Sequence, residues 1–87
     1  MTARHRKDLR ARVRALRTQH HALAREYSEV KERVTEYTER RFLSQGEELE
    51  CKTLQRIKLR KKDELEQLTR ELQRLEEGLV TSGVKVL

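Results

Sequence analysis

The chain has 87 residues, of which 41% are charged and 34% hydrophobic, and its formal net charge is +6. So little apolar material in so short a chain excludes a conventional globular core and indicates one small domain. The sequence has three aromatic residues, no Pro and no Trp, which excludes a sheet-rich domain and is typical of an elongated, all-α protein.

Charge and cysteine usage predict a cytoplasmic protein. Basic residues recur from Arg4 to Arg17 without the apolar run of a secretory signal. No stretch approaches the ~20 apolar residues that cross a bilayer, so we expect no membrane contact. The lone Cys51 fits a reducing compartment.

The first predicted element is a coiled-coil helix over about 3–43. Its apolar residues are spaced alternately by four and three, with His20 in the one gap, and this 3.5-residue period is that of a coiled-coil seam. The seam positions are Leu9, Val13, Leu16, His20, Leu23, Tyr27, Val30, Val34 and Tyr37.

A turn is predicted at about 43–45. Ser44 and Glu47 have the spacing of a capping box, in which the Ser44 hydroxyl accepts from the Glu47 amide and the Glu47 carboxylate accepts from the Ser44 amide. A second helix therefore begins near residue 45.

The second helix is expected over about 45–78, because Gly78 is typical of a helix end. Its seam positions are Cys51, Leu54, Lys58, Lys61, Leu65, Leu68, Leu72, Leu75 and Leu79. Residues 1–80 thus form a single helical hairpin, and 80–87 form a C-terminal tail.

If the chain folds back at Ser44, residues that face each other have numbers that sum to about 88. Every seam position of one helix then faces a seam position of the other helix. Charge supports this register independently. Residues 11–25 have a net charge of +4 against −4 for 63–77, and residues 26–39 have −3 against +5 for 49–62. Complementary blocks favour antiparallel pairing at one register.

Two lysines interrupt the second seam, and two interpretations stay open. In one, the stems of Lys58 and Lys61 cover Val30 and Tyr27 while their ammonium groups reach nearby glutamates such as Glu26. In the other, Ile57 turns into the seam in place of Lys58, as in a coiled-coil stutter.

A two-helix hairpin covers one side of each helix, so several apolar residues need another partner. We expect a homodimer of hairpins in a four-helix arrangement. The candidate interface residues are Tyr27, Phe42, Leu49, Ile57 and Leu59.

One motif of the second helix consists of Glu48, Leu49, Leu54, Arg56, Lys58 and Leu59, followed by Lys62-Asp63-Glu64-Leu65. This motif resembles the signature of the YdcH-like family of small bacterial proteins. Glu26, Tyr27, Val30 and Val34 resemble the first half of the family, whereas Lys58 replaces its usual Arg and Lys61 its usual Leu. The resemblance covers about residues 20–70 and implies a bacterial, cytoplasmic helical hairpin of uncharacterised function.

No catalytic, cofactor or metal site is predicted. His20 and His21 are adjacent, so on a helix they point about 100° apart and lack the spacing of a ligand pair. Cys51 has no nucleophilic partner set and suits a seam position. We therefore expect a non-enzymatic protein without cofactors.

The principal functional hypothesis is a self-associating hairpin that acts as a small protein–protein adaptor or assembly component, with an unknown partner. The alternative is non-specific binding of nucleic acid by the basic N-terminal end. The residues assigned to that alternative are Arg4, Arg6, Lys7, Arg10, Arg12 and Arg14.

Overall fold

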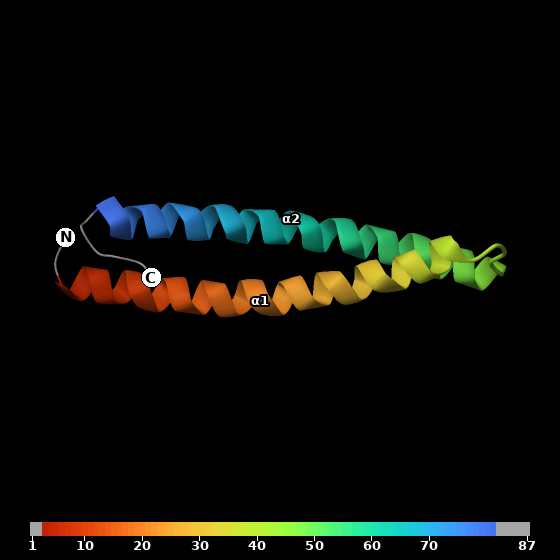
Figure 1. Ribbon diagram of the computed structural model, residues 1–87, viewed down its shortest axis with the longest axis horizontal. Coiled ribbons are helices and arrows are strands. Elements are labelled where there is room, and N and C mark those ends of the chain that lie inside the picture. The colour runs from red at the N-terminus through yellow and green to blue at the C-terminus, as the bar shows by residue number, and fades with distance from the viewer. Residues whose placement is uncertain (1–2, 82–87) are drawn as a thin grey trace.

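The structure is a computed structural model that describes residues 3–81, and it consists of two helices packed side by side (Figure 1). Helix α1 spans Ala3–Glu39 and helix α2 spans Gln45–Thr81, each of 37 residues. The helices are antiparallel, so the start of α1 and the end of α2 lie together at what we call the open end, opposite the turn end. The predicted all-α helical hairpin is confirmed.

The seam predicted from the spacing of apolar residues is the contact between the helices. Each of its eighteen positions is buried or half-buried, whereas most other positions are exposed. The ion pairs that flank the seam join residues whose numbers sum to 83 or 93. Three pairs that include a seam residue bond across the seam with numbers that sum to 87 or 89, close to the predicted 88. These pairs are His20 with Thr69, Glu26 with Lys61, and Tyr37 with Glu50.

Full burial occurs at the two ends of the seam. At the open end Val13 and Leu79 are buried together, and three half-buried leucines, Leu9, Leu72 and Leu75, pack against them. At the turn end the buried residues are Val34, Cys51 and Leu54. The middle of the seam, which contains His20, Tyr27, Lys58 and Lys61, is only half-buried.

The predicted end of the first helix near residue 43 is wrong, because α1 ends at Glu39. The Arg40 amide donates to the Tyr37 carbonyl at 3.2 Å, a tighter i to i−3 bond that closes the last turn. Antiparallel helices need a connection of a few residues to reverse direction, and residues 40–44 supply it. Because Ser44 caps α2, the residues for the connection come from the end of the predicted first helix.

The second helix continues past its predicted end at Gly78 to Thr81. Glycine in a helix costs roughly 1 kcal/mol relative to alanine. The next residue, Leu79, is only 1% exposed and packs on Val13, so burial of its side chain offsets that cost. The predicted tail at 80–87 lies outside the described residues from position 82 onward.

Neither α1 nor α2, within residues 3–81, has the length and apolar character of a membrane-spanning helix.

Candidate functional site

The capping box at the start of α2 is confirmed. The Glu47 amide donates to Ser44 Oγ at 3.1 Å, and the Ser44 amide donates to Glu47 Oε1 at 3.0 Å. The other carboxylate oxygen of Glu47 accepts from Arg40 Nη1, so this one side chain binds both the cap and the first residue of the connection. These bonds fix where α2 begins relative to α1.

Glu50 links the helices one turn further along. Its Oε1 accepts from Arg33 Nη2 at 2.5 Å and its Oε2 accepts from the Tyr37 hydroxyl at 2.6 Å. The guanidinium of Arg40 lies 5.6 Å from the centroid of the Tyr37 ring, within the range of a cation–π contact. The hydrogen bond to Glu50 raises the pKa of Tyr37 above its ordinary value of 10.0, since it stabilises the protonated phenol.

The first interpretation of the two seam lysines is confirmed for Lys61. Lys61 Nζ donates to Glu26 Oε2 at 2.9 Å, while its side chain is 23% exposed, so the stem is largely covered. Lys58 and Ile57 are both half-buried. Ile57 therefore does not displace Lys58 to the outside of the hairpin.

Ion pairs across the seam distinguish two sides of the hairpin. Arg12 and Glu71 each precede a seam residue and pair at 2.7 Å, and Arg33 and Glu50 do the same at 2.5 Å. Arg17 and Glu76 each follow a seam residue and pair at 2.7 Å. We call the side of the hairpin on which residues precede a seam residue, such as Arg12 and Arg33, the preceding side. The opposite side, on which residues such as Arg17 follow a seam residue, is the following side.

The five candidate interface residues do not form one surface. Ile57 precedes Lys58 and is half-buried on the preceding side, whereas Leu59 follows Lys58 and is 58% exposed on the following side. Phe42 lies in the connection at 84% exposure, and Leu49 lies in the second turn of α2 at 66%. Tyr27 is a half-buried seam residue.

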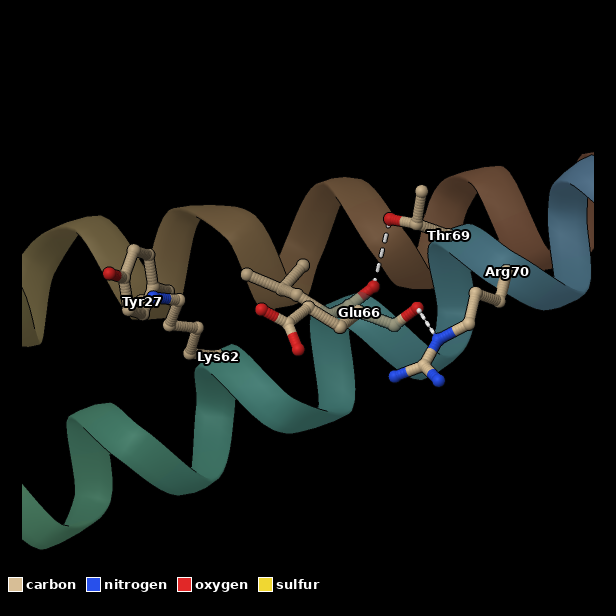
Figure 2. A pocket seen from close by; sticks show the side chains of 6 residues that line it. Tyr27, Lys62, Glu66, Thr69 and Arg70 are labelled. Atoms are coloured by element: carbon tan, nitrogen blue, oxygen red, sulfur yellow. Dashed lines mark hydrogen bonds between the residues drawn. The ribbon is translucent and has the colours of Figure 1, made fainter.

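Tyr27 borders an open groove of about 480 Å³ on the following side. Figure 2 shows its lining, in which Tyr27 comes from α1 and the other side chains come from α2. Those of α2 are Lys62, Leu65, Glu66, Thr69 and Arg70. The exposed Leu59 lies three residues before Lys62, which is about one helical turn, so it adjoins one end of the groove.

The six candidate nucleic-acid contacts differ in their surroundings. Arg12 pairs with Glu71. Arg6 is half-buried and lies three residues before Leu9, at the next position that the seam spacing gives. Arg4, Lys7, Arg10 and Arg14 are exposed and make no ion pair with residues 3–81. The sequence signal for the pairing of Arg12 with Glu71 was the opposite net charge of residues 11–25 and 63–77.

His20 and Cys51 both lie in the seam between the helices. His20 Nε2 forms a hydrogen bond of 3.0 Å with Thr69 Oγ1, which also lies 2.9 Å from the Leu65 carbonyl. Cys51 is a buried free thiol. Within residues 3–81, no three His, Cys, Asp or Glu side chains gather in a group that could hold a metal ion.

Comparison with protein-family models, curated proteins and solved structures finds no match for this chain. The resemblance to the YdcH-like family therefore stays a prediction from the sequence.

Proposed function

We propose that this protein is a non-enzymatic helical hairpin that self-associates and acts as a small adaptor or assembly component, in the bacterial cytoplasm that the YdcH-like resemblance implies. The observation that supports this role is the exposure of Phe42, Leu49 and Leu59, three large apolar residues on an otherwise strongly charged surface. Exposed apolar surface rimmed by polar residues is typical of sites that meet another protein.

The following side is the surface we assign to a second copy. Leu59 adjoins the groove beside Tyr27 and Leu65, so a hydrophobic side chain and a concavity lie next to each other. In a two-fold dimer the same surface is used by both copies, and each Leu59 then enters the groove of the other. Two hairpins paired in this way form the four-helix arrangement.

The turn end is the surface we assign to another protein. Phe42 and Leu49 lie at the tip, away from the groove, and the capping box and Glu50 hold the backbone between them. A rigid tip with two exposed apolar side chains needs little ordering when it binds, which reduces the entropic cost of association.

Self-association is tested by sedimentation of Leu59→Glu beside Ile57→Glu. These matched variants add the same charge two residues apart on opposite sides of α2. Leu59→Glu should sediment as a monomer, whereas Ile57→Glu should keep the mass of the wild type. A wild-type monomer, or an equal loss of mass in both variants, would refute this interface.

The variant Phe42→Ser distinguishes self-association through the groove from self-association through the turn end. It should leave the dimer intact, because Phe42 lies in the connection and outside the groove. If Phe42→Ser is monomeric while Leu59→Glu is dimeric, self-association occurs through the turn end, and the assignment of the two surfaces is reversed.

A further inference from the structure

We infer that α1 binds the phosphodiester backbone of nucleic acid through a basic stripe on the following side of its first half. We define the basic stripe as Lys7, Arg10, Arg14 and Arg17. This activity goes beyond the adaptor role and does not depend on self-association. It also differs from the contact set expected from sequence, because Arg4, Arg6 and Arg12 lie outside the stripe and Arg17 is added.

The stripe follows the seam along the helix. Its members are spaced by three, four and three residues, and Arg10, Arg14 and Arg17 come directly after Leu9, Val13 and Leu16. One residue along a helix is a rotation of about 100°, so the four side chains form a line beside the seam. With a rise of 1.5 Å per residue, this line is about 15 Å long.

Most of the positive charge of the stripe is available to a ligand. All four side chains are exposed. Arg17 is bound by Glu76 at 2.7 Å, but Lys7, Arg10 and Arg14 make no ion pair with residues 3–81. Arg12, which belongs to the same basic run in the sequence, is on the preceding side and is bound by Glu71.

The two sides of α1 differ in sign. No acidic residue occurs between Asp8 and Glu26. Along the whole helix, positions that follow a seam residue include Arg10, Arg14, Arg17 and Lys31 and no acid. Positions that precede one include four acids against two arginines, namely Asp8, Glu26, Glu29 and Glu36 against Arg12 and Arg33. The positive potential is therefore concentrated on one side.

A polyanion fits this surface better than a membrane does. A helix that binds a membrane inserts a free apolar face between the lipids. In α1 that face is the seam, and α2 covers it. A second copy is disfavoured at the stripe itself, because a two-fold contact there would bring the two basic stripes together.

The expected contact is with the backbone and is independent of base sequence. Lys and Arg side chains are common donors to phosphate oxygens, and such contacts carry no base-sequence information. The stripe also contains no aromatic residue on which a base could stack. Lys7, Arg10 and Arg14 make no ion pair with residues 3–81 and can each contact a phosphate. Three such contacts imply that the logarithm of the binding constant falls with the logarithm of salt concentration with a slope of about −3, a loss of roughly fortyfold in affinity between 50 and 200 mM salt.

The test is fluorescence anisotropy of the full chain with a labelled random-sequence duplex across that salt range. Wild-type protein should bind, with the slope given above. Lys7→Gln with Arg14→Gln should reduce the slope by about two and weaken binding at least tenfold at low salt. Arg60→Gln with Arg74→Gln is the matched control, since it removes the same charge from the preceding side of α2 and should change affinity less than threefold.

Three results would overturn the inference. They are the absence of duplex binding at 50 mM salt, an equal loss in both double variants, and binding to phosphatidylserine vesicles without binding to the duplex. An equal loss would mean that net charge alone attracts the nucleic acid. Circular dichroism of each variant, with unchanged helicity, keeps a loss of binding distinct from a loss of fold.

Discussion

The two ends of the hairpin are held by different kinds of interaction. At the turn end, Glu47 and Glu50 accept hydrogen bonds from the cap, from α1 and from the connection, around the buried Val34, Cys51 and Leu54. At the open end, the contact is the apolar cluster around Val13 and Leu79, with exposed ion pairs at its edges.

This difference separates register from stability. Directed hydrogen bonds near the turn permit one alignment of the helices, because Glu50 of α2 must meet Arg33 and Tyr37 of α1. Apolar contacts are less directional, so the open end adds burial in the alignment that the turn has already set. The half-buried middle, with Lys61 bonded to Glu26, contributes least to either.

The largest effect should come from the open end. Leu79→Ala removes the most deeply buried side chain and should lower the free energy of unfolding by about 2 kcal/mol or more, roughly 10 °C in melting temperature. Thermal unfolding followed by circular dichroism measures it. Gln67→Ala, at an exposed position on the same helix, is the control, and a similar small change in both would show that the open end is not packed as described.

The middle of the seam should become more stable when its polarity is removed. Lys61→Leu loses the bond to Glu26 but buries an apolar side chain at a half-buried position, and we expect a gain of about 1 kcal/mol. Lys52→Leu, at an exposed position of α2 outside the groove, should give no such gain. A lower melting temperature for Lys61→Leu would show that the ion pair outweighs apolar packing.

At the turn end, Ser44→Ala should cost about 1 kcal/mol, because the Glu47 amide loses its acceptor. This corresponds to roughly 5 °C in melting temperature. Ser28→Ala is the matched control, since Ser28 is exposed in the middle of α1 and alanine is the better helix former there. If both variants melt alike, the capping box does not stabilise the turn.

The smallest effect concerns pH and the Tyr37 bond. The pKa of Tyr37 is raised in the folded protein, so the stability from its bond to Glu50 is present at neutral pH and is lost as the pH rises through that raised pKa. Between about pH 9 and pH 11 the melting temperature of the wild type should fall more than that of Tyr37→Phe. Parallel curves would contradict the role given to this bond.

The seam, the capping box and the register could be read from the sequence because each depends on local spacing. The alternation of three and four placed Val13, Val34 and Leu54 in the contact, and all are buried. The spacing of Ser44 and Glu47 located the start of α2. Such patterns repeat with the helical period, so no knowledge of distant residues is needed.

The helix ends and the grouping of surface residues could not be predicted in the same way. Gly78 has the local signature of a helix end, yet α2 continues because Leu79 packs on Val13, a residue far away in the sequence. Ile57 and Leu59 are close in the chain but lie on opposite sides of the hairpin. Which basic residues are neutralised likewise depends on partners in the other helix, such as Glu71 for Arg12.

The sequence by itself determined that this chain is two helices joined by one turn, and which line of residues joins them, because the period of apolar residues and the cap are local properties. Only the tertiary structure decided where each helix ends and which surfaces are free. It also decided which side of α1 stays positively charged. These depend on pairing between residues tens of positions apart, and that pairing exists only once the helices lie side by side.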